Sequence, residues 1–152
     1  MNVFFADEQD HPVDAKPLWN IAAGVLQEEG LPPETEVAVV LVGPKEMADY
    51  NERFMSRRGP TDVLAFPLEE FLPGRPPVAE PNGPPLNLGD VFICPTVVQE
   101  NSEATGVAFD DEMALMVVHG LLHLLGYDHV RDDDAERMEL RERRLLELVT
   151  KR

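Results

Sequence analysis

The sequence predicts a single α+β domain. Its 152 residues suit one main core, because a chain of this length buries roughly 68–70% of its unfolded surface. Short runs rich in β-branched residues alternate with segments of helical periodicity. No internal repeat and no linker divides the chain. We therefore expect about four strands with about five helices packed on them.

The first half of the chain predicts two pairs of a strand followed by a helix. Asn2–Phe5 is a short apolar run, and the helix after it has Asp14 as a candidate N-cap and Gly30 as its stop. Glu36–Val42 is rich in β-branched residues, and Lys45–Phe54 has helical composition. The apolar positions of the first helix fall on one face: Leu18, Ile21, Ala22, Val25 and Leu26.

Two more short strands are expected at Val63–Phe66 and Gly89–Cys94. The segment between them, Pro67–Pro85, holds seven of the 14 prolines. It should form an irregular surface loop, because proline lacks the backbone donor that helices and central strands need. The rest of the chain predicts three helices, with the ranges Pro95–Glu103, Asp110–Leu125 and Asp132–Val149.

Composition restricts the function. The chain has 13 Lys and Arg against 29 Asp and Glu, a net charge of -16, whereas nonspecific nucleic-acid binders usually carry a basic surface. The excess acid lies in residues 1–130, because residues 131–152 hold seven basic and seven acidic side chains. The single Cys94 excludes an internal disulfide and a cysteine-based zinc ribbon, and we expect it to be a buried apolar residue. The sequence contains no apolar run of the roughly 18 residues that span a membrane and no signal peptide, so we expect a cytoplasmic protein without membrane contact.

Three of the four histidines lie within eleven residues, in the segment HGLLHLLGYDH. His119 and His123 are four residues apart, so both imidazoles project from one face of a helix. Gly126 can adopt the left-handed conformation that ends a helix, which would turn the chain and return His129 to the same point. We expect the three side chains to converge.

Three imidazoles leave a fourth tetrahedral position for water, which is the arrangement of catalytic zinc. A metal there would activate water and polarise a phosphoryl or carbonyl oxygen, so hydrolysis is the expected chemistry. The alternative is that His119 and His123 are buried helix residues hydrogen-bonded to the backbone and that His129 is a turn residue. The clustering of three histidines favours a metal site over this alternative. Ligand type favours zinc, although imidazole also suits nickel, copper and iron.

The same spacing occurs in the metzincin metalloproteases, whose motif is HExxHxxGxxH. In those enzymes a glutamate general base follows the first histidine, whereas this chain has Gly120, which cannot transfer a proton. A metalloprotease is therefore disfavoured. Asp128 is the nearest carboxylate, and it either orients a histidine, handles protons or is simply a turn residue. The pattern assigns no general acid.

The segment HGLLHLLGYDH closely resembles the signature of the YbeY family, bacterial endoribonucleases that act in ribosomal RNA maturation. Two further segments resemble motifs of the family: PTDVLAFP at residues 60–67 is similar to PTDVLSFP, and LGDVFI at residues 88–93 is similar to LGDIVI. With matching order and length, the resemblance covers essentially the whole chain, as one metal-dependent hydrolase domain over residues 1–152.

The resemblance implies an α+β fold with a small mixed sheet and one zinc ion held by His119, His123 and His129, with water as the fourth ligand. It also implies a single-strand-specific endoribonuclease that acts in 16S rRNA 3′ end maturation and ribosome biogenesis by metal-activated attack of water on a phosphodiester. Ribosomal RNA is the expected partner, with ribosomal proteins or ribosome-associated factors, and no DNA is expected.

One position departs from the family pattern. The family commonly has an arginine four residues after an asparagine ahead of PTDVLSFP, and counting from Asn51 that position is Met55. Arg57 and Arg58 lie two and three residues later and are the candidate substrate-binding residues, because a planar guanidinium suits phosphate. The alternative is that both belong to a solvated loop.

RNA can be the substrate of a chain with this net negative charge under two conditions. Either a local basic cleft near the metal opposes the negative field of the whole protein, or the main partner is the protein surface of the ribosome. A function of a different class also stays open: a noncatalytic ribosome-assembly factor in which zinc only stabilises the C-terminal helix.

Overall fold

The computed structural model describes residues 1–78 and 80–150, and this part of the chain contains four strands and five helices. Their order and type confirm the prediction of a single small α+β domain, with bounds that differ from the expected ones by a few residues. The elements are β1 (Asn2–Glu8), α1 (Ala15–Glu28), β2 (Glu36–Val42), α2 (Pro44–Met55), β3 (Val63–Pro67), β4 (Asn87–Ile93), α3 (Pro95–Thr105), α4 (Phe109–Leu124) and α5 (Asp132–Thr150).

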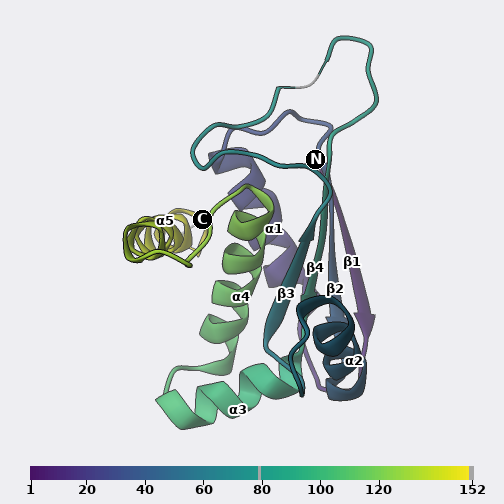
Figure 1. Cartoon of the computed structure of the whole chain (residues 1–152), viewed down its shortest axis with the longest axis vertical. Coiled ribbons are helices and arrows are strands. Elements are labelled where there is room, and N and C mark those ends of the chain that lie inside the picture. The colour runs from purple at the N-terminus through teal and green to yellow at the C-terminus, as the bar shows by residue number, and fades with distance from the viewer. Residues whose placement is uncertain (79, 151–152) are drawn as a thin grey trace.

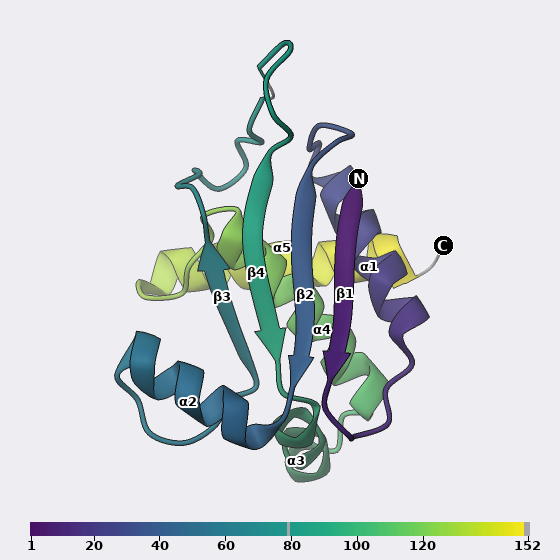
Figure 2. The ribbon, with the colours of Figure 1, turned by 90° about the vertical axis from the view of Figure 1, so that its right-hand side faces the viewer.

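The sheet is mixed, as the family resemblance implies. Its strand order is β1-β2-β4-β3, and Figure 2 shows the four strands face on. β1 pairs with β2 and β2 with β4 in parallel, whereas β3 runs antiparallel to β4 at the edge of the sheet. The connection between β3 and β4 is the proline-rich segment, which forms turns and irregular backbone over residues 68–78 and 80–86, as predicted.

The helices cover the two faces of the sheet unequally. Figure 1 shows α1 and α4 beside one face, with α5 farther from the sheet across them, while α2 lies on the opposite face at one end. The main core lies between the sheet and α4, where Val91, Leu121 and Leu122 are fully buried. A smaller core under α2 contains Met47 and Leu64. The helix that carries the first two histidines is therefore anchored on the largest apolar cluster of the domain.

Several local predictions are confirmed. The side chain of Asp14 caps α1 by accepting a hydrogen bond of 3.3 Å from the backbone N–H of Lys16. Cys94 is fully buried, and this burial raises the pKa of its thiol, as expected for an unreactive apolar residue. Among the described residues, none of the helices is long and apolar enough to cross a membrane.

Candidate metal centre

The end of α4 is built to turn the chain back on itself. Gly126 has a φ of 98°, and its backbone N–H donates to the carbonyl of His123 at 3.1 Å, while that of Tyr127 donates to the carbonyl of Leu122 at 3.0 Å. These two bonds form a Schellman motif, which satisfies the last carbonyls of the helix. A Cβ atom at Gly126 would lie 2.0 Å from the carbonyl oxygen of Phe71, so the turn needs glycine for space as well as for conformation.

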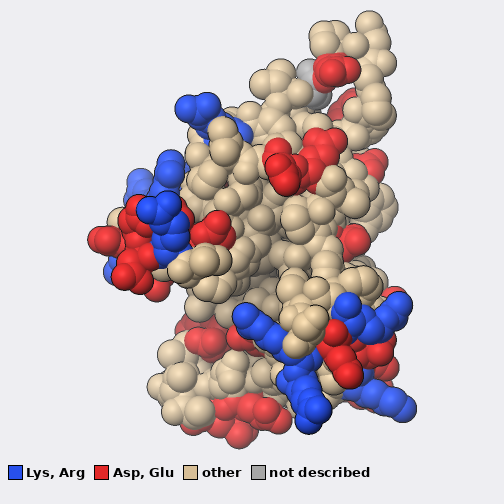
Figure 3. Space-filling model, in the orientation of Figure 1, with Lys and Arg blue, Asp and Glu red and all other residues tan. Residues whose placement is uncertain are grey.

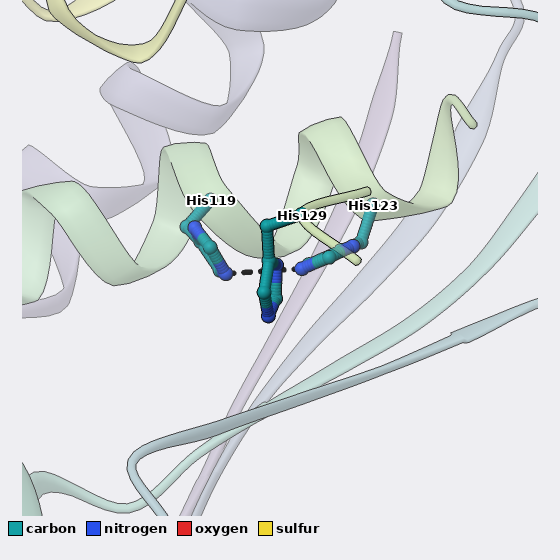
Figure 4. Close-up of side chains that lie close together, drawn as sticks. All are labelled: His119, His123 and His129. Carbon is teal, nitrogen blue, oxygen red and sulfur yellow. Dashed lines mark hydrogen bonds between the residues drawn. The ribbon is translucent and has the colours of Figure 1, made fainter. Parts of the chain in front are cut away.

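This turn brings the three histidines together, as predicted from their spacing. Figure 4 shows His119 and His123 on successive turns of α4, with the ring of His129 placed between them by the segment that follows. The Nε2 atoms of His119 and His123 are 3.0 Å apart, and one nitrogen from each of the three rings lies within 4.8 Å of the others. Nitrogen ligands 2.0–2.1 Å from a tetrahedral zinc ion are about 3.3–3.4 Å apart. The three side chains could therefore hold a metal ion with small adjustments.

Hydrogen bonds orient two of the rings. Nδ1 of His123 lies 2.9 Å from the carbonyl oxygen of Tyr127, and Nδ1 of His119 lies 3.3 Å from Oε2 of Glu142. A carbonyl and a carboxylate only accept, so each Nδ1 must carry the hydrogen and donate it. In a neutral ring this leaves a lone pair on Nε2. Two lone pairs that face each other at 3.0 Å need a positively charged partner, which a metal ion or a proton supplies.

His123 is the member of the trio with a strongly shifted pKa. Burial is the largest cause, and together with charge repulsion from His119 and His129 it lowers this pKa to about 4. At neutral pH the imidazole of His123 is therefore uncharged, which is the form that binds a metal.

Glu142 is the residue of this site that the sequence analysis missed. It lies on the charge-rich helix α5, yet it is only 8% exposed and contacts His119. The ion pair of Arg141 with Glu29, 2.6 Å between Nε and Oε1, ties α5 to the end of α1 nearby. A signal was present in the sequence, since Glu142 lies on the helix face of the buried Met138, Leu145 and Val149.

The histidines lie in a cleft of about 570 Å³ that also takes in the edge strand β3 and the end of α2. Of the two candidate substrate-binding residues, Arg57 lines this cleft and Arg58 is exposed outside it. Met55, where the family commonly has arginine, also lines the cleft. Asp128 lines it too, and its Oδ1 accepts a hydrogen bond of 3.3 Å from the backbone N–H of Val130, as a turn residue does.

Asn51 holds the segment that carries Arg57. It is buried, and its backbone carbonyl accepts a hydrogen bond of 3.2 Å from the N–H of Arg57. Its side-chain amide donates to the carbonyl of Gly59 at 2.9 Å. The backbone of residues 57–59 is thereby tied to α2 rather than left as a free loop, and Arg57 is held at the cleft.

Gly120 occupies the position at which the metzincin motif has glutamate. A Cβ atom at Gly120 would lie 2.4 Å from Cγ1 of Val91 and 3.4 Å from Cγ2 of Val63, because α4 packs directly on the sheet there. Unless the side chain of Val91 moves, this helix position has no room for a side chain. Glycine at this position cannot transfer a proton, and the packing around it leaves no space for the glutamate that serves as general base in the proteases.

Basic side chains gather beside the cleft despite the net charge. Figure 3 shows Lys and Arg over α2 and the segment after it, next to the hollowed part of this face. From Arg53 to Thr61 the sequence contains three arginines and no acidic residue. Within the described residues, neither Arg57 nor Arg58 forms an ion pair with a carboxylate. This end of the cleft therefore offers unpaired guanidinium groups, although the carboxylates of Asp62 and Asp128 also line the cleft.

Comparisons with known proteins agree with the sequence motifs. Residues 4–150 match the family model described as Endoribonuclease YbeY. A protein of Acidothermus cellulolyticus named Endoribonuclease YbeY is 44% identical over 138 residues, which cover 90% of this chain and 84% of that protein. One of the same name from Mycobacterium leprae is 40% identical over 148 residues, 97% of this chain and 82% of that protein. The solution structure of TM1509 from Thermotoga maritima superposes with a TM-score of 0.65 at 28% identity, covering 97% of this chain and 88% of that one.

Proposed function

The chain belongs to the YbeY endoribonuclease family, and on that premise we propose that it is a metal-dependent endoribonuclease that hydrolyses single-stranded RNA. The observation that carries the proposal is the pair of inward-facing Nε2 atoms of His119 and His123, each fixed by a hydrogen bond on the opposite nitrogen. With His129 they form the proposed ligand set for one zinc ion, with water as the fourth ligand.

The metal, when bound, would supply Lewis acidity that lowers the pKa of bound water toward about 7 and neutralises phosphate charge. The chain's own residues do the rest. Glu142 and the carbonyl of Tyr127 hold the rings of His119 and His123 in place, so binding costs little reorganisation. Arg57 would bind the phosphodiester at the cleft, because the carbonyl of Asn51 fixes its backbone there and, among the described residues, its guanidinium forms no ion pair with a carboxylate.

The substrate we propose is the precursor of the 16S rRNA 3′ end, processed in the cytoplasm during ribosome biogenesis, with ribosomal proteins or ribosome-associated factors as further partners. The basic segment around Arg57 and Arg58 supports direct RNA contact, because it provides local positive charge in a chain of net charge -16. Arg58 lies outside the cleft and would contact a flanking phosphate.

The decisive experiment is cleavage of an end-labelled RNA containing the precursor 3′ end by protein whose metal content has been measured. His123→Ala serves as the site variant. His11→Ala is the matched control, because His11 is the only histidine outside the trio and it stacks on Phe109 with ring centroids 5.0 Å apart. We expect cleavage by the parent chain and by His11→Ala, and none by His123→Ala.

Equal cleavage by all three proteins would identify a contaminating nuclease and refute the proposal. No cleavage by any of them would favour the noncatalytic assembly factor, in which the metal serves stability alone. The metal measurement in the same samples decides between zinc and another ion that imidazole binds, such as nickel, copper or iron.

A further inference from the structure

An exposed aromatic side chain stands next to the cleft without belonging to it. Phe54, near the end of α2, is 56% exposed and is not among the residues that line the cleft. Its ring and that of Phe66 form an edge-to-face pair with centroids 5.3 Å apart, and the ring centroid of Tyr50 lies 6.3 Å away. These contacts hold the ring in place, so a rigid aromatic surface faces solvent at this point.

Arginines accompany this ring. The guanidinium carbon of Arg53 lies over the ring of Phe54, 5.3 Å from its centroid. Arg57 and Arg58 follow within four residues, and neither is paired with a carboxylate in the described part of the chain. Arg53 has Asp49 as its partner, 3.3 Å between Nη1 and Oδ2 in an exposed pair that contributes little energy. The acid-free run from Arg53 to Thr61 thus combines an aromatic face with guanidinium groups.

We propose that Phe54 is a base-stacking subsite for the part of the RNA strand that leaves the cleft past Met55. The inference rests on the proposed function, because it takes single-stranded RNA as the substrate. Single-stranded nucleic acid binds where a positive groove follows the backbone and aromatic side chains stack the bases. Met55 is 42% exposed and lines the cleft, so the strand reaches Phe54 by passing one residue beyond the cleft wall.

The charge pattern favours RNA over a protein as the occupant. A partner protein with a complementary apolar face would gain from Phe54 and Met55, but it would leave the guanidinium groups of Arg57 and Arg58 without acceptors. A polynucleotide offers a phosphate and a base at each step and satisfies both groups. Because Phe54 lies outside the cleft, its contribution is to binding and not to the chemical step.

The test measures binding by fluorescence anisotropy with two labelled probes of equal length. One is a 2′-O-methyl oligouridine 12-mer, and the other is a 12-mer ribose-phosphate chain without bases; a gel confirms that both stay intact. Phe54→Leu is the site variant. Phe4→Leu is the matched control, because Phe4 is 60% exposed on β1, at the far edge of the sheet from β3.

We expect Phe54→Leu to weaken binding of the oligouridine by about 5- to 150-fold, the range for loss of one stacked base, with unchanged binding of the abasic chain. Phe4→Leu should bind both probes as the parent does. Arg58→Ala should weaken both probes equally and reduce the salt dependence of binding, as loss of a phosphate contact does. In RNA cleavage, Phe54→Leu should raise KM with little change in kcat.

The subsite would be overturned if Phe54→Leu bound the oligouridine as tightly as the parent chain does. It would also be overturned if this variant weakened binding of the oligouridine and of the abasic chain equally. The parent's cleavage of RNA is measured in parallel and separates the two proposals. If the parent cleaves RNA and Phe54→Leu has no effect on oligouridine binding, the proposed nuclease function stands and the proposed subsite is refuted. If Phe54 contributes to base-dependent binding but the parent does not cleave RNA, the subsite is supported and the proposed nuclease function is refuted.

Discussion

Replacement of Glu142 tests how the metal centre is held. Its Oε2 lies 3.3 Å from Nδ1 of His119, and the contact is shielded because Glu142 is nearly buried. Glu142→Gln keeps the size and an acceptor oxygen but loses the charge, and Glu142→Ala loses the acceptor as well. Partners of this kind typically contribute 10- to 100-fold to metal affinity.

The chemistry of the contact sets the order of the two variants. A hydrogen bond to a charged group contributes about 1.5–3 kcal/mol and a neutral one about 1 kcal/mol, so Glu142→Gln should cost about 1 kcal/mol and weaken metal binding by about 5- to 10-fold. Glu142→Ala should approach 100-fold. Competition against a colorimetric zinc chelator measures both affinities.

Glu139→Gln is the matched control, because Glu139 is exposed on the same helix and, in the described part of the chain, forms no ion pair with a histidine. Circular dichroism checks that α5 remains folded in each variant. Metal affinity of Glu142→Ala equal to that of Glu139→Gln would refute the orienting role of Glu142 and with it the argument that the rings are held in advance.

Three further predictions concern packing, protonation and the arginine segment. Gly120→Ala should lower the free energy of unfolding by about 1–3 kcal/mol in urea titrations, because its Cβ meets Val91, and the added change Val91→Ala should recover part of the loss. In the metal-free folded chain the pKa of His123 is about 4, whereas its ordinary value is 6.5, so the unfolded state binds a proton more readily than the folded state. The free energy of unfolding should therefore fall as the pH drops from about 6.5 toward 4. In His123→Asn this fall should be less steep. Asn51→Ala removes the hydrogen bond to Gly59, and it should cost about 1 kcal/mol and raise KM for RNA more than it lowers kcat, measured by steady-state cleavage.

The sequence predicted most of this fold because its local signals agree with one another. The spacing of His119, His123 and His129 with Gly126 between the last two was sufficient to predict convergence, since helix periodicity and one left-handed residue determine it. The wide separation of Asn51 and Gly59 from the histidines in sequence gave no such signal. The place of Asn51 at the cleft depends on β3 joining the sheet at its edge.

Glu142 could not be assigned to the site for a related reason. Its contact with His119 spans two helices, and only the crossing of α5 over α4 brings the two side chains together. A carboxylate within an apolar helix face signals a buried partner but does not identify it. Arg57 and Arg58 looked equivalent in the sequence, and the turn after α2 places only Arg57 at the cleft.

The close approach of α4 to the sheet at Gly120 constrains how this site can evolve. A lineage that starts from this packing cannot reach the glutamate chemistry of the metzincin proteases by one substitution, because the new side chain would collide with Val91 before it could serve as a base. The β4 side of the contact would have to become smaller first, and that change alone leaves a cavity in the core. Two hydrolytic chemistries that share one histidine spacing are therefore separated by a stability barrier in sequence space.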